Sequence, residues 1–342
     1  MTGGLSGQEQ EMLRDSVRAF LAARGDRSWA ALVDRLELGE ALRDARQGAI
    51  VAEEIGRARA ALPFAETAVT QWLLERCGGP GFEAAAVLTM AWAEPGMRYD
   101  MADIAMTARR DGDGWRLGGS KSAVGWAPAC DRLVVAARTA GTVGERGGLS
   151  LFLLDPALAP NLRTHAHRTI DGRPAADLIF EDQFFGADAL IGKPDQAIDL
   201  IEEARDRATA LLAAEAVGLL DSLLAQCIAY TGQRRQFDRP LADFQALQHR
   251  MVDMYLECEL ARSAAWLAVE ALDEDAATRA HAVSSAMVNI ARGCRFVGQQ
   301  AIQLHGGMGM TDELPLGHYV KRAMAIEVEW ADADWHLARI AG

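Results

Sequence analysis

The sequence predicts an α+β multidomain protein with an N-terminal helical domain, a middle antiparallel β-domain and a C-terminal four-helix bundle. Hydrophobic residues recur at helical spacing in the first part of the chain and again after residue 193, whereas short runs at strand spacing fill the stretch between them. No internal repeat and no low-complexity segment interrupts this order. The expected domains therefore span residues 1–86, 87–193 and 194–342.

In the first domain, two apolar runs at helix spacing predict two helices. Leu13, Val17 and Leu21 mark the first helix, and a second run begins near Ile50. Pro63 is expected to end that second helix, because proline cannot continue the backbone hydrogen bonding. The sequence Gly78-Gly79-Pro80-Gly81 then makes a firm break.

The middle domain is predicted from short strands without helices between them. Residues 109–117 indicate a strand, an Asp-Gly turn and a second strand. Further strands are expected at 133–137, 150–154 and 177–180, and His165 and His167 alternate at the surface of another. This spacing favours an antiparallel sheet or small barrel over βαβ units.

The last domain is predicted to be helical throughout. A long helix starts near Leu211 and runs to about Arg235, and further helices are expected at 244–272, 278–304 and 316–340. The long apolar stretch from 208 to 230 contains Glu215, Asp221 and Gln226, so we expect a buried helix and not a membrane span.

The overall composition excludes several classes of function. The 342 residues include 35 Lys and Arg against 48 Asp and Glu, a net charge of −13 that would repel a nucleic acid backbone. Five scattered cysteines without a C-x-x-C pair indicate reduced thiols in a cytoplasmic protein and no zinc or other metal site. The first ten residues lack a basic start followed by an apolar core, so no signal peptide is expected.

Two motif clusters lie at the ends of predicted helices. The first cluster begins at Arg234. Its arginines suit bidentate contact with phosphate and its aromatic rings could support a flat heterocycle, but the same residues are typical of a basic helix C-terminus. The glycines of the second let backbone approach a ligand, or simply form a helix C-cap and turn. The clusters are Arg234-Arg235-Gln236-Phe237-Asp238-Arg239-Pro240-Leu241, followed by Phe244-Gln245, and Gln303-Leu304-His305-Gly306-Gly307-Met308-Gly309-Met310.

These clusters, in this order and after an α-then-β layout, resemble the acyl-CoA dehydrogenase family over nearly the whole chain. Four further segments are similar to its N-domain helix, the start of its β-domain, its W-x-L-x-G-x-K strand pair and the segment that closes the β-domain. They are Glu53-Glu54-Ile55-Gly56-Arg57-Ala58, Ala93-Glu94-Pro95-Gly96, Gly114-Trp115-Arg116-Leu117-Gly118-Gly119-Ser120-Lys121, and Phe180-Glu181-Asp182-Gln183 with Leu190-Ile191-Gly192.

The resemblance implies FAD as cofactor and the oxidation of an acyl-CoA thioester between its α and β carbons. A carboxylate base removes the α-proton while hydride leaves the β-carbon for the flavin. In the family, the two C-terminal motifs reach the FAD of a neighbouring subunit. Carried over position by position, the resemblance implies FAD contacts from Arg234, Gln236, Phe237, Gln303 and Gly307.

The resemblance also implies that the catalytic base is missing. Trp330 stands where most relatives carry the catalytic glutamate, and Ala208 stands at the position that a minority use. An indole is a donor only, and a methyl group accepts no proton. Glu329 is the one replacement candidate, although a neighbouring residue on a helix points about 100° away. The alternative for Glu329 is an ordinary surface or ion-paired glutamate.

The chain's own flavin contacts depart from the family pattern as well. Met97, Arg98 and Tyr99 replace small residues after the E-P pair, and residues 122–125 lack the aromatic and hydroxyl side chains that pack on the flavin in relatives. The usual arginine near the start of the long helix is replaced by Thr209. Between residues 32 and 53 there is no room for the glycine-rich loop of the N-domain.

This pattern of loss and retention resembles the small, non-catalytic subunit of actinobacterial heterotetrameric (α2β2) acyl-CoA dehydrogenases. Such a subunit completes the FAD site of a related, full-length partner, which holds the acyl-CoA, and many of these enzymes act in β-oxidation of steroid side chains. Two alternatives remain: a self-sufficient homotetrameric dehydrogenase that uses Glu329 as base, and a purely structural subunit.

Overall fold

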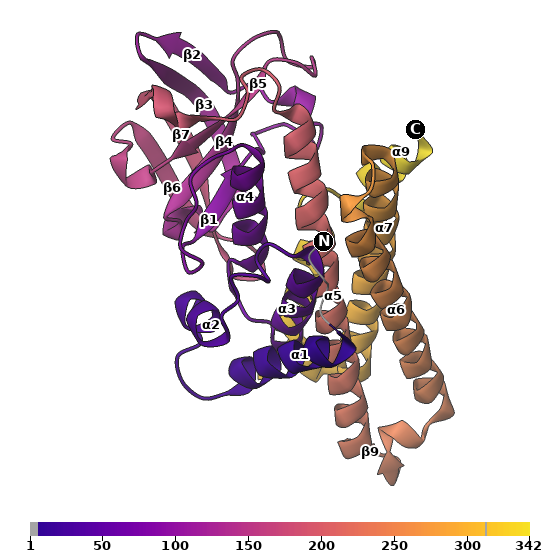
Figure 1. Ribbon diagram of the computed structural model, residues 1–342. Helices are drawn as coiled ribbons and strands as arrows, with labels where there is room; N and C mark the ends of the chain where they lie inside the picture. Colours follow the sequence, from indigo (N-terminus) through magenta and orange to yellow (C-terminus); the bar gives the residue numbers. More distant parts are fainter. Residues whose placement is uncertain (1–5, 312) are drawn as a thin grey trace. The chain divides into compact units, whose positions relative to one another are not determined.

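The computed structural model describes residues 6–311 and 313–342, and the chain forms two compact units (Figure 1). The first unit comprises residues up to 27, residues 44–62 and residues 209–342. The second comprises residues 28–43 and 63–208. Of the ten N-terminal residues that bear on the absence of a signal peptide, 1–5 lie outside the described residues. The predicted boundaries at 86/87 and 193/194 stay a prediction.

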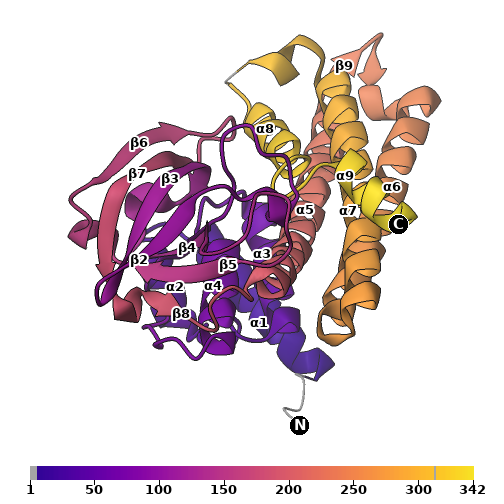
Figure 2. The same ribbon diagram turned by 90° about the horizontal axis from the view of Figure 1, so that it is seen from above.

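The second unit is built on a mixed β-sheet with the order β6-β7-β3-β2-β4-β5-β8, in which β1 also pairs with β4. Figure 2 shows β6 and β7 side by side in this sheet. Most pairs are antiparallel as predicted, but β1 and β2 both meet β4 in parallel. The strands are β1 (Leu88–Ala91), β2 (Thr107–Asp111), β3 (Gly114–Gly125), β4 (Arg132–Arg138), β5 (Leu149–Leu154), β6 (Leu162–Arg168), β7 (Pro174–Gly186) and β8 (Leu190–Ile191).

Two helices, α2 (Trp29–Leu36) and α4 (Phe64–Arg76), belong to the sheet unit. Pro63 is the N-cap of α4, so the predicted role of Pro63 as the end of the preceding helix is wrong. That helix, α3, ends earlier, at Ala58, and its C-cap residue Arg59 adopts a left-handed conformation with φ 49°. Thr67 of α4 accepts a hydrogen bond from the Leu88 amide at 3.2 Å and so ties the helix to β1.

The first unit contains α1, α3 and the C-terminal helices, and α5 supplies its residues from 209 onward. Helices α6, α7 and α8 pack in sequence with one another, and α9 packs on α7. The helices are α1 (Gly7–Ala22), α3 (Ala45–Ala58), α5 (Ile198–Gln233), α6 (Gln245–Glu270), α7 (Ala276–His305), α8 (Leu316–Ile326) and α9 (Ala333–Ala341).

The last predicted helix, 316–340, is interrupted. Trp330 has φ 67° between α8 and α9, and such a left-handed residue breaks a helix. Asp332 then caps α9 by accepting a hydrogen bond from the Trp335 amide at 2.8 Å. The prediction of one continuous helix over 316–340 was wrong because hydrophobic residues recur at helical spacing on both sides of the break.

Two glycines explain how closely α3 and α5 cross. A Cβ atom added to Gly56 would lie 1.9 Å from the Glu215 carbonyl oxygen, and one added to Gly218 would lie 1.8 Å from the Glu53 carbonyl oxygen. Both distances are far below any van der Waals contact, so only glycine permits this approach of the two backbones. The glycine of the E-E-x-G-R segment therefore has a packing role.

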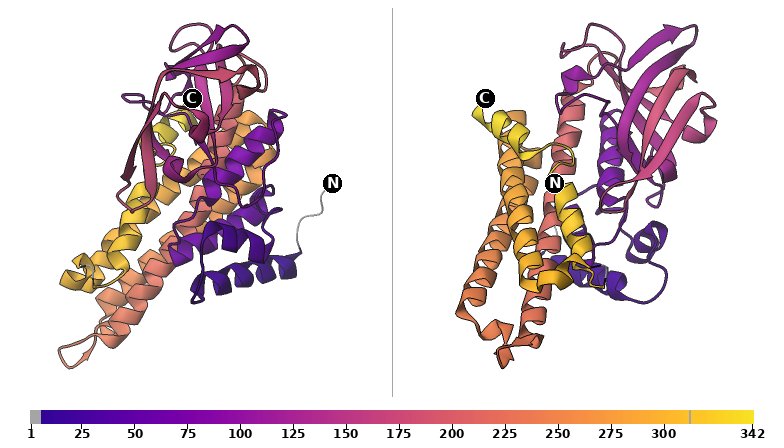
Figure 3. Two further views of the ribbon diagram at one scale, coloured as in Figure 1. Left: turned by 90° about the vertical axis from the view of Figure 1, so that its left-hand side faces the viewer. Right: turned by 180° about the vertical axis from the view of Figure 1, so that it is seen from behind.

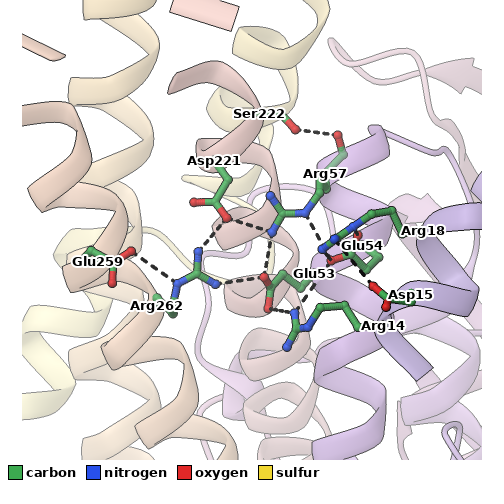
Figure 4. Close-up of polar contacts among 10 residues, drawn as sticks. All are labelled: Arg14, Asp15, Arg18, Glu53, Glu54, Arg57, Asp221, Ser222, Glu259 and Arg262. Carbon is green, nitrogen blue, oxygen red and sulfur yellow. Dashed lines mark hydrogen bonds and ion pairs between the residues drawn. The ribbon is translucent and has the colours of Figure 1, made fainter. Parts of the chain in front are cut away.

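The charged residues of the same segment form an ion-pair network around the crossing (Figure 4). Glu53 binds Arg14 at 3.0 Å and Arg262 at 2.9 Å, and Arg57 binds Asp221 at 2.8 Å. The Glu53 side chain is 4% exposed. Because the partners come from α1, α3, α5 and α6, the network joins four helices of the first unit.

This network predicts an acid sensitivity centred on Glu53. Burial opposes its charge, but the ion pairs with Arg14 and Arg262 outweigh this and hold the pKa of Glu53 below its ordinary value of 4.5. The unfolded state therefore binds more protons below pH 4.5, and the stabilisation from Glu53 is lost as the pH falls through the folded-state pKa. In urea unfolding between pH 6 and pH 3, Glu53→Gln is expected to flatten the loss of stability on the acid side. Glu75→Gln, an exposed ion-pair control, should retain the original slope.

Helix α5 is long and apolar enough to cross a membrane by length and composition. Its most apolar 18-residue window has a mean hydropathy of 1.6, and 72% of that window is buried inside the protein. Such burial is typical of a core helix, which agrees with the expectation drawn from Glu215, Asp221 and Gln226.

Candidate functional site

A β-hairpin between α5 and α6 carries the first predicted motif. Strands β9 (Arg235–Gln236) and β10 (Arg239–Pro240) pair antiparallel around the two-residue turn Phe237-Asp238. Both turn residues have positive φ, 51° and 64°, the geometry of a type I′ turn. The turn holds the Phe237 ring 84% exposed.

Local contacts fix this hairpin. The rings of Phe237 and Phe244 meet edge to face with centroids 6.1 Å apart, and the Arg239 guanidinium lies 4.0 Å above the Phe244 ring. Arg235 donates a hydrogen bond to the Asp238 carbonyl oxygen at 2.6 Å. An exposed aromatic ring held this way keeps a flat apolar surface available at small entropic cost.

The second motif ends α7. Gly306 has φ 59° and ψ −141°, a conformation open essentially to glycine alone, so the glycine does form the helix C-cap that the sequence left open. Residues 306–310 follow as a short 3₁₀ helix. Gln303 and Gly307 are both exposed at this end of α7.

A stacked ring pair connects the two motifs. The rings of Tyr230 and His305 lie 4.3 Å apart with an angle of 28° between their planes, and His305 Nδ1 lies 2.9 Å from the Ala301 carbonyl oxygen. Tyr230 is one turn before Arg234, whose amide donates to the Tyr230 carbonyl oxygen at 2.8 Å. The ends of α5 and α7 thus meet, and both motifs lie toward one end of the helical bundle (Figure 3).

All five predicted cofactor residues lie in the first unit and are exposed: Arg234, Gln236, Phe237, Gln303 and Gly307. Three of them share the hairpin, and two share the end of α7. Their role in FAD binding stays a prediction, whereas the alternative of a basic helix C-terminus does not describe the hairpin, because the chain leaves the helix at Gln233.

Neither expected base position holds a proton acceptor. Ala208 is completely buried in α5. Trp330 packs against the core of the helical bundle, partly buried. Since an indole donates but does not accept, these positions supply no base.

Glu329 is held by an arginine. Its Oε2 lies 2.7 Å from Nη1 of Arg322, while Nε and Nη2 of Arg322 donate to the two carboxylate oxygens of Glu215 at 2.8 and 2.9 Å. The side chains of Arg322, Glu215 and Glu329 are 4%, 6% and 29% exposed. Of the two readings of Glu329, the structure shows the ion-paired one, and taking up a substrate proton would break this pair.

The two middle-domain segments that depart from the family's flavin-contact pattern, residues 97–99 and 122–125, follow Glu94 and Lys121, which form a buried ion pair. Lys121 is completely buried and bonds Glu94 at 2.6 Å, and burial lowers the pKa of Lys121 to about 8 against the opposing effect of Glu94. Ala123, with φ 50°, donates its amide to Asp177 at 2.8 Å. Arg205 fixes the segment 97–99 by donating to the Tyr99 carbonyl oxygen at 2.8 Å. This ion pair and these hydrogen bonds hold the two segments in place, but Ala123 and Gly125 present neither the ring nor the hydroxyl group that packs on the flavin in relatives.

Two family profiles match the chain. The acyl-CoA dehydrogenase middle domain matches residues 89–183, and the acyl-CoA dehydrogenase C-terminal domain matches residues 198–329, together about two thirds of the chain. The chain belongs to the acyl-CoA dehydrogenase family. The bovine mitochondrial short-chain specific acyl-CoA dehydrogenase is 30% identical over 257 residues, and the glutaryl-CoA dehydrogenase of Desulfococcus multivorans is 28% identical over 232 residues. These matches cover 74% and 67% of this chain but only 61% and 59% of the relatives.

Solved acyl-CoA dehydrogenase structures share the whole fold. A variant of the steroid acyl-CoA dehydrogenase Tcur3481-Tcur3483 has a TM-score of 0.81 at 26% identity, covering 98% of this chain and 97% of that one. The ChsE4-ChsE5 complex of Mycobacterium tuberculosis has a TM-score of 0.83 at 24% identity, with coverage of 98% and 97%. The predicted order of helical, β and helical parts is thereby confirmed.

FAD is the cofactor of this acyl-CoA dehydrogenase family, and one similar solved structure is described as an FAD-dependent dehydrogenase. The exposed side chains of the hairpin and of the α7 end fit it: a guanidinium suits a pyrophosphate, a ring suits a flat heterocycle, and an amide both donates and accepts. No group of three metal-ligating side chains occurs within residues 6–311 and 313–342.

The sequence motifs include Lys121 and Glu94, but neither their ion pair nor the ion pair of Arg322 with Glu215 was predicted. In both cases a signal exists, because a charged residue at a buried position of a regular pattern requires a partner of opposite charge. Glu215 interrupts the apolar run of α5 in this way, and its partner Arg322 lies 107 residues further on.

Proposed function

We propose that this chain is a subunit of a flavin-dependent acyl-CoA dehydrogenase that lacks its own catalytic base and completes the FAD site of a related partner. The observation that carries the proposal is that the chain keeps an exposed Phe237 hairpin while Trp330 and Ala208 stand at the positions of the catalytic glutamate. The reaction is the α,β-dehydrogenation of an acyl-CoA thioester in β-oxidation, in a cytoplasmic α2β2 complex.

The residues of this chain would act on the cofactor by position and charge. Arg234 would bind the pyrophosphate, Phe237 would pack against the adenosine, and Gln303 would donate and accept hydrogen bonds at the same ligand. When bound, FAD supplies the acceptor for the hydride. The base and the acyl-CoA cleft would come from the partner, since Glu329, the replacement candidate predicted from the sequence, is engaged by Arg322.

A steroid side-chain thioester is the proposed substrate class. The support is the similarity to the structure described as a steroid acyl-CoA dehydrogenase, Tcur3481-Tcur3483, at 26% identity. Physically, a subunit that holds no substrate of its own leaves space for a bulky ring system. This substrate assignment rests on the proposed subunit role.

The experiment is co-expression with a full-length relative encoded nearby, followed by counting flavin per chain from the absorbance spectrum. The chain alone is expected to bind little or no FAD and to show no dehydrogenase activity, and the complex is expected to gain both. In the complex, Arg234→Ala and Gln303→Ala should lower the flavin content, because each removes a ligand contact. Arg109→Ala, an exposed arginine on β2, is the matched control and should leave the flavin content unchanged.

Two results would contradict the proposal. A yellow, active homo-oligomer formed by this chain alone would favour the self-sufficient enzyme, and Glu329→Gln should then reduce turnover by about 10²–10⁴-fold, the usual contribution of a general base. The proposal expects Glu329→Gln to have little effect on turnover of the mixed complex. Unchanged flavin content in the Arg234→Ala and Gln303→Ala complexes would favour a purely structural subunit.

A further inference from the structure

His305 is a buried histidine that the proposed flavin contacts do not use. It is 6% exposed, whereas Gln303, two residues before it, and Gly307, two residues after it, are both exposed. Burying an imidazole costs free energy unless its polar atoms find partners, so a histidine at this position requires a reason. Three contacts from different parts of the first unit meet at this one side chain.

The first contact fixes the orientation of the imidazole ring. Nδ1 of His305 lies 2.9 Å from the Ala301 carbonyl oxygen, one turn earlier in α7. Because a carbonyl oxygen only accepts, Nδ1 carries the hydrogen of this bond. The ring is thereby held to its own helix, and one of its faces is presented to α5.

The second contact is the stack on Tyr230 of α5. The two ring centroids are 4.3 Å apart with 28° between the planes, and the Tyr230 hydroxyl donates to the His305 carbonyl oxygen at 3.4 Å. A ring contact and a hydrogen bond between the same two residues restrict both sliding and rotation. The last turn of α5 is thus held against the last turn of α7.

The third contact comes from the turn that follows α7. A Cβ atom added to Gly309 would lie 3.2 Å from Cβ of His305 and 3.1 Å from the Ile302 carbonyl oxygen, so the turn folds back onto the histidine. Gly307 lies in the same turn, and no atom lies within 4 Å of a Cβ placed there. Packing at Gly309 therefore holds the backbone of Gly307 open to a ligand.

Tyr230 is also bound to the base of the hairpin. The Arg234 amide donates to the Tyr230 carbonyl oxygen at 2.8 Å, and the Leu241 amide, beyond the hairpin, donates to the Arg234 carbonyl oxygen at 2.8 Å. At the other end of the path, the Gly306 amide donates to the Gln303 carbonyl oxygen. A continuous series of contacts therefore leads from Gln303 to Arg234 through the rings of His305 and Tyr230.

We propose that Tyr230 and His305 are positioning residues for FAD, because their stack sets the spacing between the hairpin and the end of α7. Contacts that reach one ligand from two helix ends bind it tightly when their spacing is fixed beforehand, since ordering them on binding costs free energy. Neither ring touches the cofactor in this proposal, and both act through the residues that do. The inference rests on the proposed function and adds two residues that are not among the predicted FAD contacts.

The test is the dissociation constant of FAD for the complex with the full-length relative, measured by fluorescence titration of the flavin-free complex. His305→Leu and Tyr230→Leu each remove the stack and should weaken FAD binding by about threefold to tenfold, the effect of losing one aromatic pair. His305→Phe and Tyr230→Phe keep two rings in contact and should retain most of the wild-type affinity. If His305→Leu does not fold, His305→Gln takes its place, because it keeps a donor for the Ala301 carbonyl oxygen without a ring.

His336→Leu separates positioning from folding. His336 is another buried histidine of the first unit, and its Nδ1 lies 3.1 Å from Oγ of Ser284. Ser284 lies toward the start of α7, about 31 Å from His305 at 1.5 Å per residue. Figure 1 shows α9, which carries His336, and β9 of the hairpin at opposite ends of the helical bundle. This variant should lower the melting temperature of the chain and leave the affinity for FAD unchanged.

A double-mutant cycle with Arg234→Ala tests the route of the effect. Because Tyr230 acts through Arg234, Tyr230→Leu should weaken FAD binding less in a complex that already carries Arg234→Ala. Full additivity, equal losses in the phenylalanine and leucine variants, or unchanged affinity in both leucine variants would overturn the proposal. If the leucine variants bind FAD normally while Arg234→Ala loses flavin, the proposed function stands without this inference. If Arg234→Ala also keeps its flavin, both fail.

Discussion

Arg322→Ala is expected to lower the free energy of unfolding by about 3–5 kcal/mol, the range measured when one partner of a buried ion pair is removed. Arg322 donates to both carboxylate oxygens of Glu215 and to Glu329, and the side chains of Arg322 and Glu215 are nearly inaccessible to water. The alanine variant leaves the Glu215 carboxylate buried without its guanidinium. Urea unfolding followed by circular dichroism measures the change.

Arg295→Ala is the control for that prediction. Arg295 also donates twice to one glutamate, Glu327, but its side chain is 65% exposed, so its loss should cost no more than about 1 kcal/mol. The double variant Glu215→Gln/Arg322→Met should be more stable than Arg322→Ala, because it removes the buried charge together with its partner. Equal losses for Arg322→Ala and Arg295→Ala would show that burial of the pair has no energetic role.

Gly218→Ala is expected to destabilise the fold by about 3 kcal/mol or more, although alanine is the better helix former by about 1 kcal/mol. The added methyl group would lie 1.8 Å from the Glu53 carbonyl oxygen and 2.8 Å from the Arg57 amide nitrogen, so α3 and α5 would have to move apart. Moving them would also stretch the ion pair between Arg57 and Asp221. The melting temperature and the urea midpoint should both fall.

Gly232→Ala, in the same helix, provides a control with the opposite sign. No atom lies within 4 Å of a Cβ placed there, so the higher helix propensity of alanine should raise stability by up to about 1 kcal/mol. The position is near the helix end, where this gain is smaller. A loss of stability in both variants, or in neither, would contradict the close crossing at Gly218.

Regular periodicity made most of the fold predictable. The helices at 245–270 and 276–305 lie within two residues of their predicted bounds. The hairpin predicted at 109–117 is formed by β2 and β3, but its two turn residues are Gly112 and Asp113 and not an Asp-Gly pair. The parallel contacts of β1 and β2 with β4 were not predictable, since nothing local to a strand encodes the direction of its neighbour. The break at Trp330 was missed because a left-handed tryptophan leaves no local sequence signal.

The candidate site, like the fold, could be predicted only in part from the sequence. Phe237 and Gln303 could be singled out because their motifs are contiguous in sequence, and the structure adds that Tyr230 and His305 connect them. The fate of Glu329 could not be predicted, because its partner Arg322 is one of 35 basic residues and pairs with Glu215 from a distant helix. Side-chain pairing across helices depends on the tertiary fold and not on spacing along the chain.

The crossing of α3 and α5 bears on how a family member without the usual catalytic residues can arise. Gly56, Gly218 and the Glu53 network stabilise the first unit, and none of them is among the predicted cofactor contacts or base positions. Energetic effects at separate sites are close to additive, so a duplicated gene can accept substitutions at its catalytic positions while its product still folds. Retention of the E-E-x-G-R segment in a family member is therefore a record of fold stability and carries no information about whether that copy is still an active enzyme.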